Sequence, residues 1–310
     1  MAGLNVSCGY FFAVLALCQV VRMVSRRLLP LQVYIFLAEL ATCFQLGAFW
    51  LELRMLVVIG PWGGGFGMDV VLTLLFILFL IHEATLDGAQ ANPLITLQEL
   101  LRSNSSLAVA TLKTLSQFGG THLASVVAKV YWSWELTDFH LIQNMMAIDC
   151  SSAIQTSVSH AALAEAACAF LFHLVVMKFE GAALGYRILS KALTITALVY
   201  TAGPYTTALF NPALAFSVTF HCSGNTLLEY MLVYWLSPLI ATTLAVLLFH
   251  GNIPLVFSKN LLYSQRPKYK IPKGKSTLGP EENKTANRQQ ARKRNIHKKV
   301  LEVVMDKENN

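Results

Sequence analysis

Charged side chains are scarce in this chain. Asp, Glu, Lys and Arg make up 13% of its 310 residues, whereas 55% of the residues are hydrophobic. Soluble globular domains carry about a quarter charged residues. The shortage of charge therefore argues against an ordinary soluble protein and predicts a membrane protein.

Motifs of catalysis and metal binding are missing as well. The six cysteines form no C-x-x-C pair and show no zinc spacing, so they predict neither a disulfide nor a metal site. The sequence contains no nucleophile elbow, P-loop or dinucleotide fingerprint, and no pair of catalytic groups has a useful spacing in the apolar segments. We therefore expect neither an enzyme nor a cofactor.

The charge that is present is concentrated at the C-terminus. From Lys259 onward the chain has 14 Lys and Arg against five Asp and Glu, whereas residues 1–258 have 10 against 12. Behind a membrane body, such a basic and polar tail is expected to be disordered and to face anionic lipid headgroups rather than nucleic acid. We therefore expect three regions: an N-terminal hydrophobic segment over 1–30, a membrane domain over 31–251 and a basic tail over 252–310.

Apolar runs follow one another along the body. They lie at about residues 8–21, 32–51, 68–84, 106–131, 156–178, 188–203 and 228–250. Most are near the ~20 residues that cross a ~30 Å hydrocarbon core as a helix, so the sequence predicts an all-α membrane protein. The first run is short and has no basic stretch before it. We expect it to be an extra anchor or an interfacial helix rather than a cleaved signal peptide.

Flanking charges orient the other six runs. When the segment before Leu31 and the C-terminal tail are placed in the cytosol and the rest is threaded alternately, 22 of the 24 Lys and Arg fall on the cytosolic side. Only Arg54 and Lys129 fall opposite, as expected because cytosolic loops are enriched in basic residues. The tryptophans expected to form an aromatic belt on that opposite side are Trp50, Trp62, Trp132 and Trp134.

The runs form two halves with matching landmarks. Both Glu39–Phe44 and Glu165–Phe170 read E-x-A-x-x-F, and an Asn-Pro pair follows 53 residues after the first Glu and 46 residues after the second. Three runs in each half give the halves opposite orientations in the membrane. Inverted repeats of this kind form sites near the bilayer midplane.

The two Asn-Pro boxes are the strongest candidates for a functional site. They read Asn92-Pro93-Leu94 and Asn211-Pro212-Ala213. Asn caps a helix N-terminus and Pro suits the first helical position, so each box predicts a short half-helix that starts inside the membrane. Two positive helix ends would then meet at the centre and oppose the passage of cations and protons. The alternative for a single box is an ordinary turn, but two boxes at matching places favour the half-helices.

Glu39 and Glu165 are the carboxylates inside apolar runs that recur in both halves. Ionisable residues within membrane segments are functional candidates by default. We expect each carboxylate to accept hydrogen bonds from backbone N–H groups of the re-entrant loop in its own half. Proton relay is the alternative.

The histidines predict no metal or catalytic site. His82, with Glu83 beside it, is expected at a solvated helix end, with a place at the edge of a vestibule as the alternative. His173 and His221 have no partner at ligand spacing in the sequence, so both are expected to be structural.

In these features the stretch from about Leu31 to Gly251 resembles the aquaporin (major intrinsic protein) family. The phrase Asp-Gly-Ala-x-Ala-Asn-Pro at the first box, Ala-Gly-Pro-Tyr-Thr before the second and Cys222 nine residues past Ala213 are similar to its superaquaporin branch. The resemblance implies an aquaporin-like channel domain with six transmembrane helices and two re-entrant half-helices. It also implies a homotetramer with one pore per subunit, passive water flow, and residence in the endoplasmic reticulum or another intracellular membrane.

Two positions depart from the family's usual pattern. Leu94 closes the first box, where Ala is usual, and Leu214 follows the second box, where most members place an Arg in the selectivity filter. The family's spacing adds Ala208, Val199 and Leu72 to the expected filter.

An apolar filter offers water few replacement hydrogen bonds. The departures therefore leave three readings open. Water flow could be slow, the filter could admit glycerol or hydrogen peroxide, or the protein could keep the fold, hardly conduct and serve organelle homeostasis.

Overall fold

The computed structural model describes residues 3–59, 66–146 and 150–256, and every structural statement below concerns these residues. The chain divides into two compact units, Met1–Ser264 and Gln265–Asn310, and all described residues belong to the first unit. The expected basic tail from Lys259 onward and Trp62 lie outside the described residues.

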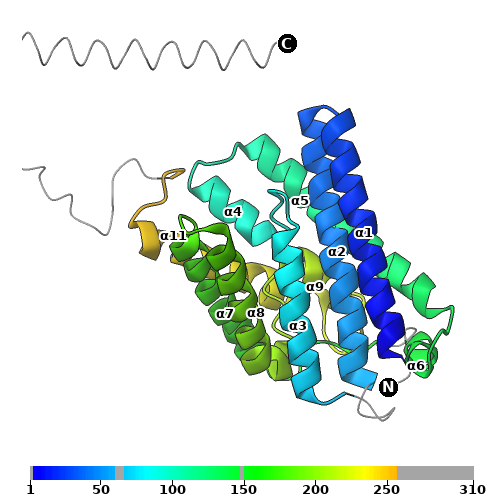
Figure 1. Ribbon diagram of the computed structural model, residues 1–310. Helices are drawn as coiled ribbons and strands as arrows, with labels where there is room; N and C mark the ends of the chain where they lie inside the picture. Colours follow the sequence, from blue (N-terminus) through cyan, green and yellow to red (C-terminus); the bar gives the residue numbers. More distant parts are fainter. Residues whose placement is uncertain (1–2, 60–65, 147–149, 257–310) are drawn as a thin grey trace, which may run out of the picture. The chain divides into compact units, whose positions relative to one another are not determined.

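The first apolar run belongs to a longer helix than expected. Helix α1 spans Leu4–Leu28, and α2 follows at Leu31–Ile59 after Leu29 and Pro30. The two helices lie side by side and run in opposite directions (Figure 1). At 1.5 Å per residue α1 is about 38 Å long, and it is apolar enough to cross a membrane. Because one face of α1 packs along α2, its position favours a spanning anchor over a surface-lying helix.

The later elements follow the predicted runs. They are α3 (Met68–Ala84), α4 (Pro93–Leu101), α5 (Leu107–Trp132), α6 (Asp138–Met146), α7 (Val158–Phe179), α8 (Leu184–Thr206), α9 (Pro212–Thr219), α10 (Leu227–Met231), the π-helix η1 (Leu232–Leu236) and α11 (Ser237–His250). The last three form one unbroken helical stretch from Leu227 to His250. The short helix α6 was not expected. The described residues contain no strand, so the predicted all-α class is confirmed.

Helices α1, α2, α7 and the stretch Leu227–His250 are each long and apolar enough to cross a membrane by themselves. Helix α3 has 17 residues, and α5 carries Ser116, Gln117 and Thr121. These three polar side chains are fully buried in the protein rather than turned outward. A helix that hides its polar groups against neighbouring helices does not have to expose them to lipid.

Small residues let α2 and α5 approach closely. A Cβ added at Gly120 would collide with the backbone oxygen of Leu40, and one at Gly47 would collide with Ala124. Such close backbone approach is the usual way in which membrane helices pack, because lipid supplies no hydrophobic force between them. The closely packed pair α2–α5 lies against the two short helices, α4 and α9, both of which contact α5.

The bundle has two ends, which we name for orientation. The α4 face is the end of the bundle where the chain turns from α1 into α2 and where α11 ends (Figure 1). The α6 face is the opposite end, where α2 and α5 end and where α6 lies. Helices α4 and α9 both begin in the interior of the bundle.

Candidate functional site

Each Asn-Pro box starts a short helix, as the capping rule predicts. Asn92 is the N-cap of α4, and its Oδ1 accepts a hydrogen bond of 2.9 Å from the Leu94 backbone N–H. Asn211 caps α9 in the same way and accepts bonds of 3.1 Å from Ala213 N and 3.3 Å from Leu214 N. Pro93 and Pro212 occupy the first turn, where no backbone N–H is required.

The same two asparagines join the halves of the protein. Asn92 Nδ2 donates to the Phe210 carbonyl oxygen at 3.1 Å, and Asn211 Nδ2 donates to the Ala91 carbonyl oxygen at 2.8 Å. Ala91 and Phe210 each precede the Asn of their own box, so the two contacts are related by the repeat. An amide nitrogen carries two N–H groups, and one of them is used in each contact.

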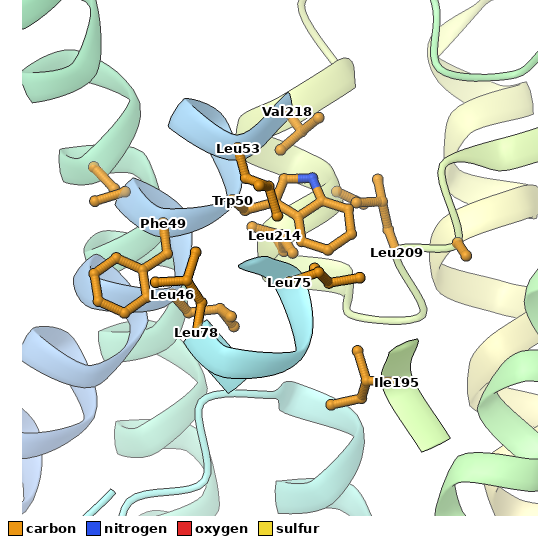
Figure 2. Close-up of a cluster of buried hydrophobic side chains, with 14 of the residues drawn as sticks. Leu46, Phe49, Trp50, Leu53, Leu75, Leu78, Ile195, Leu209, Leu214 and Val218 are labelled. Carbon is orange, nitrogen blue, oxygen red and sulfur yellow. The ribbon is translucent and has the colours of Figure 1, made fainter. Parts of the chain in front are cut away.

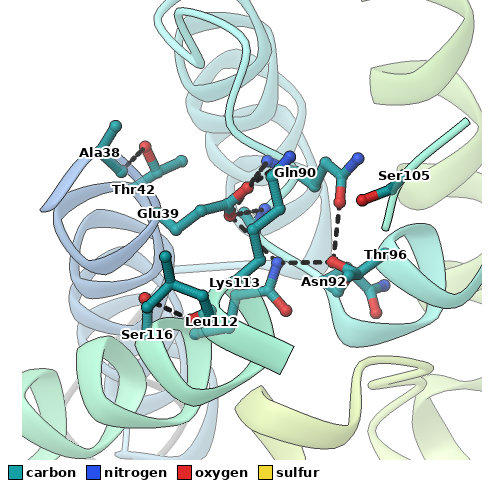
Figure 3. Close-up of polar contacts among 12 residues, drawn as sticks. Ala38, Glu39, Thr42, Gln90, Asn92, Thr96, Ser105, Leu112, Lys113 and Ser116 are labelled. Carbon is teal, nitrogen blue, oxygen red and sulfur yellow. Dashed lines mark hydrogen bonds and ion pairs between the residues drawn. The ribbon is translucent and has the colours of Figure 1, made fainter. Parts of the chain in front are cut away.

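Glu39 and Glu165 hold the loops that lead into the boxes. Glu39 accepts from the backbone N–H groups of Gln90, at 3.0 Å, and Ala91, at 3.2 Å (Figure 3). Glu165 accepts from Leu209 N at 3.1 Å and Phe210 N at 2.6 Å. These are equivalent positions in the two halves.

The loops need this support because their backbone is strained. Ala91 has φ 56° and Phe210 has φ 26°, values that non-glycine residues rarely adopt and that cost about 1–3 kcal/mol each. A carboxylate that binds two successive N–H groups fixes this conformation and keeps buried donors satisfied.

The surroundings of the two carboxylates differ. Glu39 also accepts from Gln117 Nε2 at 3.0 Å and pairs with Lys113 Nζ at 3.4 Å. Within the described part of the chain, Glu165 has no basic partner. The second loop is therefore held by a buried carboxylate and neutral donors alone.

A central cavity of about 40 Å³ lies beside the boxes. Asn92 and Asn211 both line it, as do Ala208 and Leu214 of the expected filter. The other filter candidates, Leu72 and Val199, do not line this cavity and instead pack partly buried against the main apolar core. Counting residues along a helix does not fix which side of the helix faces inward, and their place in the filter stays a prediction.

Leu94 does not narrow the cavity either. Its side chain is 2% exposed and belongs to the main apolar core. The leucine that replaces the usual Ala of the first box therefore does not line the central cavity. What the position contributes to the site is its backbone N–H, which the Asn92 side chain binds.

Trp50 lines the cavity instead. It was expected in an aromatic belt, but it is 6% exposed and lines the cavity together with Phe79 and Ile195. Figure 2 shows the Trp50 ring between Leu214 of α9 and Leu209. Trp132 is also buried, and its Nε1 donates to Glu52, whereas Trp134 is exposed as a belt residue would be. A tryptophan near the end of an apolar run has the same sequence signature in either setting.

His82 is also placed differently from the expectation. It is buried rather than solvated, it lines the central cavity, and its Nδ1 lies 3.3 Å from Gln45 Nε2. Glu83 beside it accepts a bond of 2.7 Å from Lys191. The alternative reading, a place at the edge of a vestibule, holds for Glu83, which also lines the large cavity on the α4 face.

The central cavity is related differently to the cavities on the two faces of the bundle. A vestibule of about 600 Å³ on the α4 face shares Glu83, Gln90 and Ile95 with the central cavity. On the α6 face a second cavity, of about 120 Å³, has no described lining residue in common with the central one. Apolar side chains, among them Trp50 and Leu214, cluster at the central cavity (Figure 2).

The sequence-based prediction that no disulfide is present is wrong. Cys150 and Cys222 form one, across a separation of 72 residues. Sequence spacing finds pairs that are close along the chain, and these two come together only because the loop before α7 crosses the end of α9, where Ser152 N donates to Ser223 O at 2.8 Å.

His221, which has no partner at ligand spacing in the sequence, lies next to two cysteines in space. Its ring lies with the sulfurs of Cys150 and Cys222 in a group whose atoms are all within 4.8 Å. With the two sulfurs joined, the group offers no thiolate to a metal. His173 makes a structural contact, with its Nδ1 2.6 Å from Gln98 Oε1, whereas its buried Nε2 has no hydrogen-bond partner among the described residues.

Paired half-helices, an inverted repeat and a central cavity define a membrane channel. Comparison with known proteins gives its family. Residues 60–249 match the family described as Major intrinsic protein, and the chain belongs to that family of channels, which are not enzymes.

Two relatives narrow the assignment. The chain is 50% identical to Aquaporin-12 of Mus musculus over 280 residues, covering 90% of this chain and 97% of the relative. It is 30% identical to Aquaporin-11 of Homo sapiens over 261 residues, covering 83% of this chain and 93% of the relative. The predicted superaquaporin branch is thereby confirmed.

Among solved structures, the X-ray structure of the aquaglyceroporin from Plasmodium falciparum overlaps with a TM-score of 0.49 at 14% identity. The overlap covers 69% of this chain and 95% of that one. A match this loose adds nothing to the family assignment.

Proposed function

We propose that this chain forms a passive pore for water and small neutral solutes such as glycerol and hydrogen peroxide. The observation that carries the proposal is the junction of α4 and α9. There two helix N-termini meet, and their capping asparagines bind each other's loop and line one cavity. The two boxes that form this junction are Asn92-Pro93-Leu94 and Asn211-Pro212-Ala213.

The junction favours neutral solutes over ions. Both short helices direct their positive ends at the cavity, which opposes cations and protons. Each asparagine retains an amide N–H that can donate to a passing oxygen atom. A water molecule whose oxygen accepts a hydrogen bond from both amides has its own O–H groups oriented away from them. It therefore cannot pass a proton along a single file of water molecules in the pore.

The filter of the proposed pore is apolar. Leu214 and Ala208 lie at the cavity with Trp50 and Ile195, and this wall offers water few hydrogen bonds. We therefore infer slow water flow and a filter that admits solutes with apolar surface.

A second candidate function is supported by the size of the cavity. About 40 Å³ is close to the volume of a single water molecule, and the central cavity shares no described lining residue with the cavity on the α6 face. These features favour a protein that keeps the channel fold, conducts poorly and has a structural or organelle-homeostasis role.

We propose that the α4 face is cytosolic and that the protein resides in an intracellular membrane, with the endoplasmic reticulum as the first choice. The distribution of basic residues supports this orientation. The disulfide supports it independently, because Cys150 and Cys222 lie on the α6 face and disulfides persist in oxidising compartments. In this proposal the channel domain spans residues 31–251 and the C-terminus is cytosolic. Membership of the family supports a homotetramer.

Osmotic shrinkage of proteoliposomes tests conduction. Vesicles with the wild-type protein are expected to shrink faster than empty vesicles. Asn211→Asp is expected to return the rate close to the empty-vesicle value, because a carboxylate cannot donate to the Ala91 carbonyl or to water. If wild-type vesicles shrink no faster than empty ones, the second candidate function replaces the first for water.

Leu214→Arg tests the apolar filter. The guanidinium would project from the first turn of α9 into the cavity that Leu214 lines. Glycerol flux is expected to fall at least about tenfold, since the added charge fills the space and holds water that glycerol must displace. Leu214→Met, which keeps the volume and the apolar character, serves as the control. Unchanged glycerol flux in a conducting Leu214→Arg channel would contradict an apolar filter.

A glycosylation site added at the N-terminus tests whether α1 spans. If it does, Met1 lies on the side opposite to Asn310, and a flexible extension with an acceptor site before Met1 is modified in microsomes. The same extension after Asn310 stays unmodified. Both are made in an Asn5→Gln background, because Asn5-Val6-Ser7 is itself an acceptor pattern. Modification of the C-terminal extension alone would invert the proposed orientation.

A further inference from the structure

The cavity on the α6 face is lined by basic and polar groups from four helices. Its volume is about 120 Å³, and it lies between α2, α5, α6 and the end of α9. The residues that matter here are Arg54 of α2, Lys129 of α5, Ser217 of α9 and His221 just after it. Arg54 and Lys129 are also the two basic residues that charge patterning assigns to this side of the membrane.

The positive charge of this cavity is not neutralised by the described residues. None of those that line the cavity is acidic, and neither Arg54 nor Lys129 has a carboxylate partner in the described part of the chain. Arg54 donates from Nη1 to the Val218 carbonyl oxygen at 3.3 Å, which uses one of its five N–H groups. Glu52, two positions earlier on α2, is bound instead by Ser7, Trp132 and His140.

A buried hydroxyl lacks a partner at the same place. Ser217 is 4% exposed, and its Oγ is buried without a hydrogen-bond partner among the described residues. Buried polar groups are nearly always paired, so an orphaned donor in a cavity wall indicates a missing acceptor. Ser217 lines the same cavity as Arg54 and Lys129.

The pKa of His221 is affected by the same positive charges. Burial lowers its pKa first, and the positive charges of Lys129, Arg54 and His122 lower it further. A site in which nearby cations oppose the protonation of a histidine favours a negative ligand over a positive one.

We propose that this cavity binds a phosphate oxyanion, either free inorganic phosphate or the phosphate of a lipid headgroup. Arg54 and Lys129 supply the charge, and the Ser217 hydroxyl donates a hydrogen bond. The volume holds about four water molecules, which is room for one small tetrahedral anion that replaces them. The planar guanidinium of Arg54 can bind two phosphate oxygens at once.

Titration of inorganic phosphate into the full-length protein in a non-ionic detergent tests the site. Wild-type protein is expected to show saturable binding, measured by calorimetry. Arg54→Gln and Lys129→Gln are each expected to weaken binding about tenfold or more, the scale of one charge-assisted hydrogen bond. Ser217→Ala keeps both charges and is expected to weaken binding a few-fold.

Two controls separate the site from general effects. Lys178→Gln removes an exposed positive charge that lines neither this cavity nor the α4-face vestibule, and its affinity is expected to equal that of the wild type. Arg54→Lys keeps the charge, loses the planar fork and is expected to fall between wild type and Arg54→Gln. Gel filtration confirms that each variant is folded before it is titrated.

The source of the phosphate is distinguished by competition. Phosphatidic acid added to the micelles displaces inorganic phosphate at low mole fraction if the site takes a headgroup, and leaves the titration unchanged if it takes the free anion. The proposal is overturned if wild-type protein binds neither ligand saturably. It is also overturned if Arg54→Gln and Lys129→Gln bind phosphate as tightly as the wild type.

Discussion

Glu165→Ala is expected to lower the free energy of unfolding by about 2–6 kcal/mol, because it leaves two buried backbone donors unsatisfied at about 1–3 kcal/mol each. These donors are the N–H groups of Leu209 and Phe210, which precede Asn211. Without the carboxylate, the strained backbone at Phe210 relaxes and the N-cap of α9 moves. Water flux in proteoliposomes is expected to fall with stability. Thermal unfolding in detergent measures the first effect and osmotic shrinkage the second.

Matched variants keep this prediction specific. Glu135→Ala removes an exposed carboxylate that accepts from Asn144, and it is expected to change stability by less than about 0.5 kcal/mol. Glu165→Gln retains one acceptor oxygen and is expected to lie between wild type and alanine. If Glu165→Ala unfolds and conducts like Glu135→Ala, the carboxylate does not hold the second loop.

The features found from sequence are those that obey short-range rules. Asn followed by Pro predicts a helix start from capping geometry alone, and α4 and α9 begin at these residues. The matching positions of Glu39 and Glu165 predict equivalent loop contacts because the repeat places them equivalently. Local pattern and symmetry carry enough information for these positions without any knowledge of packing.

The features missed from sequence depend on the rotation and contacts of whole helices. Trp50 and His82 line the central cavity, whereas Leu72 and Val199 do not. A helix that is apolar on every side gives no signal for which side faces the interior. These assignments require the packed bundle.

The first helix illustrates the same limit. The first apolar run is predicted to end at about residue 21, because the next residue is the charged Arg22. The Arg22 side chain is nevertheless fully buried. Its Nη2 donates to Gln19 and Gln45 at 2.9 Å each, and its Nη1 lies 3.3 Å from Thr42. In an isolated helix a charged side chain would indicate the edge of the membrane. It can lie further inside the membrane when a neighbouring helix supplies hydrogen-bond partners.

Loss of the Cys150–Cys222 disulfide is expected to lower the free energy of unfolding by about 4 kcal/mol. The bond closes a loop of 72 residues, and the conformational freedom that such a loop regains in the unfolded chain is worth about that much. The loop contains α7, α8 and α9, so the bond joins the segment before α7 to the end of the second half-helix. Cys150→Ser, Cys222→Ser and the double variant are compared by thermal unfolding in detergent.

The double variant gives the sharpest outcome. Both single substitutions break the same bond, so the double variant is expected to cost no more than about 0.5 kcal/mol beyond either single one. Cys8→Ser, which alters a free cysteine of α1, is the control and is expected to leave stability nearly unchanged. Additive losses in the double variant would show that the two thiols act separately and are not bonded.

The same bond also tests the orientation of the protein. In sealed microsomes the cytosolic side faces outward, so a membrane-impermeant reductant is expected to leave Cys150–Cys222 intact until the membrane is permeabilised. An impermeant maleimide then labels the two new thiols and shifts the protein on a gel. Labelling in sealed vesicles would place the α6 face in the cytosol, contrary to the distribution of Lys and Arg. Protection in sealed vesicles would place the phosphate-binding cavity beside Cys150 on the non-cytosolic side, where its ligand has to come from the lumen or the lumenal leaflet.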